Sequence, residues 1–106
     1  MTRIRIRLPK VVRAGEPFAV RAMIRHPMET GLRIDRTGRR VPRGIIHRFA
    51  CAMDGVPVID IAFEPAISAD PFVEFEVLAE SSGRLEFTWY DENGDVHSDS
   101  RDLRVE

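Results

Sequence analysis

The sequence contains very little that could cross-link the chain or anchor it in a membrane. One cysteine among 106 residues cannot form a disulfide within the chain. No apolar run is long enough to span a bilayer, and the stretch from Met1 to Arg5 lacks the apolar segment of a secretory signal. Taken alone, these absences predict a protein of the cytoplasm with no membrane partner.

Groups for catalysis and metal binding are also scarce. Three histidines and one cysteine are too few, and too scattered, to predict a metal site, and the sequence indicates no enzyme constellation and no cofactor. Cys51 falls on a predicted core face, which indicates a buried, inert thiol, but His47 falls on the same face and leaves a Cys/His pair open. His97 is expected at the surface. Glu74 and Glu76 alternate with apolar residues, as on a solvated sheet face.

The net charge of −1 conceals an asymmetry between the two halves of the chain. Residues 1–48 contain thirteen Lys or Arg against three acids, whereas residues 49–106 contain three against fourteen. If strands from both halves pair, opposite charges neutralise each other across a sheet. If the halves separate by face or edge, the domain is a strong dipole that orients a charged partner. The sequence leaves both arrangements open.

Alternation of apolar and polar residues is the dominant pattern in the chain. Period-two alternation predicts strands over residues 3–8, 18–25, 45–54, 58–63, 73–77, 85–90 and 96–105. Asp54-Gly55 and Asn93-Gly94 predict hairpin turns, and residues 12–16 are expected to form a turn. The last strand has little apolar periodicity, so we expect an edge strand with a bulge.

These patterns predict an all-β fold. About seven short strands, separated by turn signals and without a convincing helix, are typical of an immunoglobulin-like β-sandwich with antiparallel strands. A small open barrel is the alternative. The length predicts a single domain over residues 1–106, with no linker.

One stretch interrupts the alternation. Pro27 has no N–H for a sheet ladder and pushes His26 toward an extended conformation, so the strand that begins at Phe18 stops there. Gly31 allows a positive φ, and the segment up to Arg43 has turn chemistry but little core periodicity. A connection of this length in a small domain is often functional.

Arginines are concentrated in and after this loop. The cluster comprises Arg33, Arg36, Arg39, Arg40, Arg43 and Arg48. Nucleic-acid binding usually also requires net basicity and exposed aromatics, whereas the pI here is about 6.3 and the aromatics fall mainly at core positions. We therefore expect no nucleic-acid partner, and instead a docking surface for a protein, where arginine makes bidentate contacts.

The same loop resembles that of a known family. The peptide His26-Pro27-Met28-Glu29-Thr30-Gly31, followed by Arg33, Asp35, Gly38 and Pro42, closely resembles the signature loop of SoxZ, a subunit of the bacterial thiosulfate-oxidation carrier. The similarity continues at Ser68, Pro71, Phe72 and Phe75, and then at Thr88-Trp89, Asp91, Asn93 and Gly94. Asp70 departs from the pattern, in which Asn is expected, but both residues are turn formers.

The resemblance implies a non-catalytic subunit with an immunoglobulin-like fold that forms a heterodimer with SoxY. In that family SoxY carries the sulfur substrate on a cysteine of a flexible C-terminal arm, and the complex makes transient contacts with the other Sox enzymes of a periplasmic pathway. This sequence ends Leu103-Arg104-Val105-Glu106 without such an arm, which agrees with a non-catalytic role. The resemblance also implies export to the periplasm with a signal-bearing partner. It leaves open whether the pathway is thiosulfate oxidation or a related SoxYZ-like system.

We therefore predict that the loop contacts the partner subunit or the pathway enzymes. The residues predicted to make these contacts are His26, Pro27, Met28, Glu29, Thr30, Gly31, Arg33, Asp35 and Arg43. The rival role is structural, in which Pro27, Gly31 and Gly38 only shape a loop that covers one end of the sandwich. Two other functions stay open: a stand-alone protein-binding module, and a redox protein that depends on Cys51.

Overall fold

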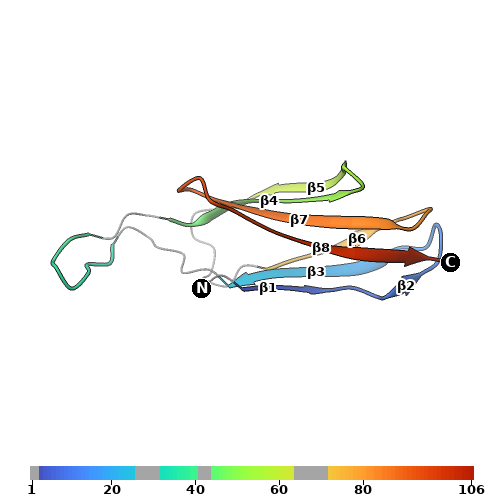
Figure 1. The fold of residues 1–106 in the computed structure, drawn as a ribbon, viewed down its shortest axis with the longest axis horizontal. Helices are drawn as coiled ribbons and strands as arrows, with labels where there is room; N and C mark the ends of the chain where they lie inside the picture. The colour runs from blue at the N-terminus through green and yellow to red at the C-terminus, as the bar shows by residue number, and fades with distance from the viewer. Residues whose placement is uncertain (1–2, 26–31, 41–43, 64–71) are drawn as a thin grey trace.

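The computed structural model is a sandwich of two β-sheets, one of three strands and one of five (Figure 1). It describes residues 3–25, 32–40, 44–63 and 72–106. Eight strands are found in these ranges: β1 (Arg3–Arg7), β2 (Val11–Val12), β3 (Phe18–Arg25), β4 (Ile46–Met53), β5 (Val56–Ala62), β6 (Phe72–Val77), β7 (Gly83–Asp91) and β8 (Val96–Val105). No helix in the described ranges is long and apolar enough to cross a membrane.

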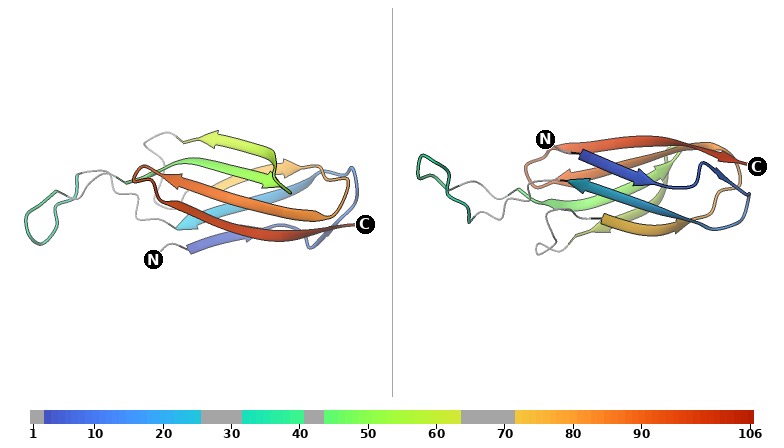
Figure 2. Two further views of the ribbon diagram at one scale, coloured as in Figure 1. Left: turned by 45° about the horizontal axis from the view of Figure 1, so that its top comes forward. Right: turned by 90° about the horizontal axis from the view of Figure 1, so that it is seen from below.

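The smaller sheet has the strand order β1-β3-β6, and the larger sheet has the order β2-β8-β7-β4-β5. Pairing is antiparallel except between β2 and β8, which run parallel over two residues. The chain therefore changes sheets between β1 and β2, at a segment that contains Pro9, a residue that cannot continue a sheet ladder. Figure 2 shows the two sheets stacked face to face, with β1 at the edge of the smaller one.

The core lies between the sheets and is centred on Phe49 of β4, which is fully buried. Its ring centroid lies 4.9 Å from that of Trp89 on β7 and 6.5 Å from that of Phe87 on the same strand. It also lies 6.0 Å from the ring of Phe75 on β6, in the opposite sheet. These separations fall in the range favoured by aromatic pairs, so Phe49 joins the two sheets through ring contacts as well as buried area.

The predicted sandwich is confirmed, and the open barrel is excluded by the two separate sheets. Alternation correctly identified the inward residues of β3, β6 and β7. The Asp54-Gly55 turn is also confirmed, because both residues have positive φ, 49° and 84°. The structure adds β2, in a segment that partly overlaps the predicted turn.

Two local predictions about β8 are corrected. The last strand is not the outermost one, because β2 pairs with it at Arg104 and Val105. The register between β7 and β8 runs without a shift from Gly83 opposite Leu103 to Tyr90 opposite Val96, so β8 has no bulge against β7. His97 lies opposite Trp89 on the inner face, and its side chain is only 20% exposed. It is therefore not a surface histidine, because its Nε2 lies 3.2 Å from the buried carboxylate of Asp91.

The predicted shared face of His47 and Cys51 is wrong. The register between β4 and β7 shifts between Ile46 and Arg48, and this irregularity puts Ile46 in the core and leaves His47 exposed. Cys51 stays buried, as predicted, with 1% of its surface exposed. A single-residue bulge changes which side chains face inward, so period-two alternation cannot hold across it.

The central position of Phe49 gives a stability prediction. Phe49→Ala should lower the free energy of unfolding by about 3–5 kcal/mol, because it removes a buried ring and leaves a cavity between the sheets. Phe72→Ala is the matched control, since Phe72 is 56% exposed, and it should cost less than about 1 kcal/mol. Urea denaturation measures both, and equal losses would contradict the placement of Phe49 at the centre of the core.

Candidate protein-docking site

Residues 32–40, which we call the tip, lie beyond the end of the sandwich at which β1 begins and β3 ends (Figures 1 and 2). All nine residues are exposed. The tip is nevertheless ordered by its own contacts, because Ile34 and Arg40 form an antiparallel bridge. The backbone N–H of Asp35 donates to the carbonyl of Arg39 at 2.8 Å, which closes the segment into a small hairpin.

The carboxylate of Asp35 holds the turn of this hairpin. Its Oδ1 accepts hydrogen bonds from the N–H of Thr37 at 2.8 Å, the hydroxyl of Thr37 at 2.6 Å and the N–H of Arg39 at 3.1 Å. Gly38 has a φ of 82°, and its N–H donates to the carbonyl of Asp35. This is the chemistry of an Asx turn completed by glycine in the left-handed region.

These bonds also change the acidity of Asp35. The hydroxyl of Thr37, as the largest cause, and the N–H of Arg39 lower the pKa of the carboxyl below its ordinary value of 3.8. Both donors favour the ionised form. Asp35 is therefore a turn-forming residue in the structure, and its predicted contact with a partner stays a prediction.

The outside of the tip combines apolar and cationic side chains. Leu32 is 76% exposed and Ile34 is 63% exposed. They share the segment with four arginines: Arg33, Arg36, Arg39 and Arg40. Arginine is enriched at surfaces that bind proteins, and here it stands beside exposed apolar area. A self-supported hairpin also loses little conformational freedom when it binds.

The tip contains only part of the predicted site. Arg33 and Asp35 lie in it, whereas residues 26–31 and Arg43 lie outside the described residues. Arg48 does not belong to the cluster. Its guanidinium makes a bidentate contact with the carboxylate of Asp60 on β5 and lies 4.9 Å from the ring of Tyr90, on the outer face of the larger sheet.

Sequence reasoning missed the role of Asp91, which is 4% exposed at the end of β7. Its Oδ1 accepts the N–H groups of Asn93 at 2.9 Å and Asp95 at 3.1 Å, and its Oδ2 contacts His97. Asp91 thus organises the β7–β8 turn. The signal that could have found it is an Asp two residues before Asn-Gly, because a short acidic side chain in that position can accept the turn N–H groups.

The Cys51 thiol is poorly placed for chemistry. Burial raises its pKa to about 11, and exposed His47 cannot pair with it across the sheet. In the parts of the chain that the structure describes, no three His, Cys, Asp or Glu side chains are grouped so that they could hold a metal ion.

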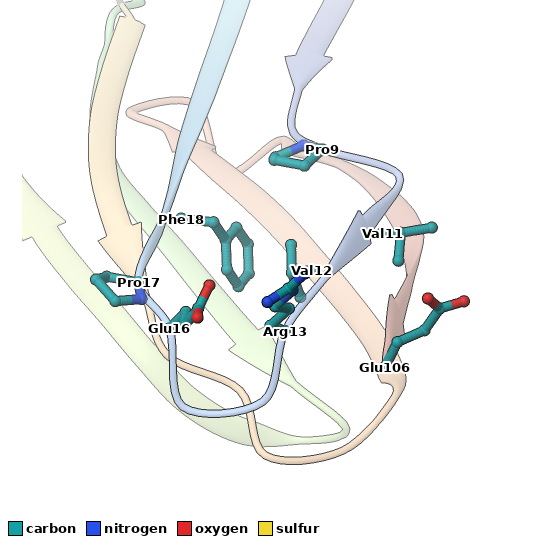
Figure 3. Close-up of a pocket in the computed structure, with 8 residues that line it drawn as sticks. All are labelled: Pro9, Val11, Val12, Arg13, Glu16, Pro17, Phe18 and Glu106. Carbon is teal, nitrogen blue, oxygen red and sulfur yellow. The ribbon is translucent and has the colours of Figure 1, made fainter.

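A cavity of about 400 Å³ opens at the other end of the sandwich, near the C-terminus (Figure 3). It is lined by Pro9, Val11, Val12, Arg13, Glu16, Pro17, Phe18 and Glu106. Its floor consists of core residues, since Val12 and Phe18 are less than 9% exposed, and its charged residues are of both signs. It has neither a nucleophile nor a group of like polar atoms directed at one point, so the tip is the better candidate site.

A comparison with protein families identifies the family of this chain. The family model of the sulphur oxidation protein SoxZ matches residues 5–102. The chain belongs to the SoxZ family. The match spans both sheets and the tip, which confirms the resemblance noted in the sequence and supports a subunit of a Sox sulfur-oxidation system.

Solved structures agree on the fold of this SoxZ-family chain. A superoxide reductase (neelaredoxin) from Ignicoccus hospitalis is 24% identical, with a TM-score of 0.75, over 97% of this chain and 80% of that one. The CARDB domain of a Pyrococcus furiosus protein, in complex with di-metal ions, is 11% identical, with a TM-score of 0.61, over 100% and 94%. At these identities the likeness shows the fold alone. No curated protein matches the chain.

The Asp35 turn predicts a pH dependence that is local to the tip. Because its pKa is lowered on folding, the carboxylate stabilises the turn above its ordinary pKa of 3.8 and loses that effect as the pH falls through the lower folded value. The NMR signals of the Thr37 and Arg39 amides should therefore hold steady from pH 7 to about pH 4 and shift below it. Asp35→Ala should shift them at every pH without changing the melting temperature. A titration midpoint at or above the ordinary value of 3.8 would contradict this account.

The burial of Cys51 predicts slow thiol labelling. Maleimide and iodoacetamide react with the thiolate, and a pKa of about 11 leaves almost none at pH 8. The native chain should therefore react at least about a hundredfold more slowly than the same chain in 6 M guanidinium chloride, where the thiol recovers its ordinary pKa of about 8.5 and full access. Rapid labelling of the native chain would instead support a redox protein that depends on Cys51.

Proposed function

We propose that this chain is the non-catalytic subunit of a heterodimeric sulfur carrier of the SoxYZ type, which takes part in thiosulfate or related sulfur-compound oxidation. The observation that carries the proposal is the state of Cys51 in a chain of a sulfur-oxidation family. A covalent sulfur carrier needs an accessible thiolate, but this thiol is 1% exposed and its pKa is raised to about 11. The covalent adduct is therefore assigned to the cysteine of a SoxY-type partner.

In this proposal the chain supports its partner through the tip. The residues 26–31 that precede it, and Arg43 that follows it, belong to the same proposed surface. Leu32 and Ile34 supply exposed apolar area, and the surrounding arginines supply charge-assisted hydrogen bonds. The turn made by Asp35 holds these side chains in position before a partner arrives, which limits the entropy lost on binding.

The proposal places the working complex in the periplasm, where the chain arrives with a signal-bearing partner and makes transient contacts with the other enzymes of the pathway. These contacts need a surface that stays available in the heterodimer. The sandwich offers several separate surfaces for this, since the tip lies beyond one end and the two outer sheet faces lie on opposite sides (Figure 2).

Co-expression with a SoxY-type subunit tests this function. The purified species should have the mass of a one-to-one complex, and mass spectrometry after incubation with thiosulfate and the pathway enzymes should locate the sulfur adduct on the partner's cysteine. A free monomer would support the stand-alone binding module instead. An adduct on Cys51 would contradict the non-catalytic role.

A matched pair of variants tests the tip in the same complex. Ile34→Ser should weaken the complex about tenfold, because it removes an exposed apolar contact from the proposed interface. Val56→Ser is the control, since Val56 is 66% exposed, Ile34 is 63% exposed, and Val56 lies at the β4–β5 turn. Neither change should alter the melting temperature. Equal affinities of the two variants would show that the tip is not the contact.

A further inference from the structure

The outer face of the smaller sheet carries an unusual concentration of arginine. We call this surface the basic face; it comprises Arg3, Arg5, Arg7, Arg21 and Arg25 on β1 and β3. The register places Arg3 directly opposite Arg25, and Arg7 directly opposite Arg21. Like charges in directly opposed positions destabilise a sheet. A negative group beside the arginines of β1 would relieve this repulsion.

The acids of the same sheet neutralise this face only in part. Glu74 on β6 lies opposite Arg21 and pairs with it at 3.4 Å. Glu76 lies one step further along β6, opposite Ala19. Among the described residues, the three arginines of β1 make no ion pair. The uncompensated charge is thus greatest along the strand at the sheet edge.

The edge position of β1 supplies a second, independent feature. Among the strands that the structure describes, β1 pairs with β3 alone, so its other side presents backbone N–H and C=O groups that a further strand could bond. The edge of the larger sheet that β5 forms is protected against the addition of a strand. β5 contains Pro57, which has no backbone N–H to donate, and its register with β4 shifts. From Arg3 to Arg7, β1 has neither a proline nor a register shift.

A groove includes this edge and continues from it over β3 as far as β6. It has a volume of about 600 Å³. β1 contributes Ile4 and Ile6 of its inner face and Arg5 and Arg7 of its outer face, and the rest of the lining is Arg21, Ala22 and Met23 of β3, Phe72 of β6 and Arg101 of β8. Ile4 and Ile6 are only half-buried, although they pack against the core. A strand laid along β1 would place alternate side chains beside these isoleucines and beside the arginines.

Charge decides which strand fits. A second copy of β1 would place arginine beside arginine in either direction, because outer residues meet outer residues. A nucleic acid would neutralise the arginines but would leave the backbone edge unpaired and the isoleucines without an apolar partner. A segment in which acidic and apolar residues alternate would satisfy the charges, the backbone and the isoleucines together.

We propose that the free edge of β1 accepts an acidic, extended segment of a partner protein as an additional strand, with its carboxylates on the basic face and its apolar side chains beside Ile4 and Ile6. This inference rests on the proposed function for the existence of such a partner. It assigns that partner a second surface, distinct from the tip.

The test uses the full chain and a fluorescent peptide in which Glu and Val alternate over seven residues, with a Lys/Val peptide of the same length as the comparison. Fluorescence anisotropy should detect binding of the Glu/Val peptide only, and binding should weaken as salt is raised. Arg5→Glu should reduce the affinity at least about tenfold. Arg104→Glu is the control, because Arg104 is an exposed arginine on β8 and should leave the affinity unchanged.

Hydrogen exchange separates strand addition from simple charge attraction. Bound Glu/Val peptide should slow the exchange of β1 backbone amides, because a new ladder would protect them. No binding, equal effects of the two arginine variants, or binding without added protection of β1 would each overturn the inference. Tighter binding of a twelve-nucleotide oligothymidine, with the same dependence on Arg5, would overturn the choice of a protein partner.

The outcome is separable from that of the proposed function. If the chain forms a one-to-one complex with a SoxY-type subunit but binds no acidic peptide, only this inference fails. If it forms no such complex, the proposed function fails whatever the peptide does.

Discussion

The contact of Phe49 with rings from both sheets is the interaction on which the rest of the structure depends. It fixes which side of β4 faces inward, and the antiparallel registers then fix the inward sides of β7 and β8 in turn. Because side chains alternate along a strand, each inward choice also determines what faces solvent. Burying Ile24 and half-burying Ile4 therefore brings the arginines of β1 and β3 to the surface together.

The same packing places the cysteine in the core and leaves the candidate docking surfaces on the outside of the sandwich. The core contains the cysteine, and its burial there removes the thiolate that sulfur chemistry would need. For a chain of the SoxZ family, this agrees with the proposed division of labour, in which the sandwich presents docking surfaces and a partner would supply the reactive group. The tip fits the same logic, because its hydrogen bonds hold a hairpin that buries none of its own apolar side chains.

The sequence predicted the structure correctly where it depends on alternation within one strand. It did not predict features that depend on how a strand pairs with another strand. The inward faces of β3, β6 and β7 follow from period-two patterns, and the Asp54-Gly55 turn follows from the φ values it requires. The exposure of His47 does not follow from the period-two pattern, because the bulge beside it is a property of the β4–β7 pair. β2 was missed for a similar reason, since its two residues pair with the distant end of β8. The tip was located as a loop without core periodicity, but its order depends on the carboxylate of Asp35.

The structure combines the two arrangements that the sequence left open for the charge asymmetry: some charges pair between the two halves of the chain, and others stay together on one sheet face. Two described ion pairs join the halves, Arg21 with Glu74 and Arg48 with Asp60. However, β1 and β3 are sheet neighbours that both come from the basic half, so their pairing sets arginine against arginine. Exposure to water and salt makes this repulsion tolerable for folding. It also repels a second copy of the same edge, so the feature that protects β1 against self-association is the one that selects an acidic partner.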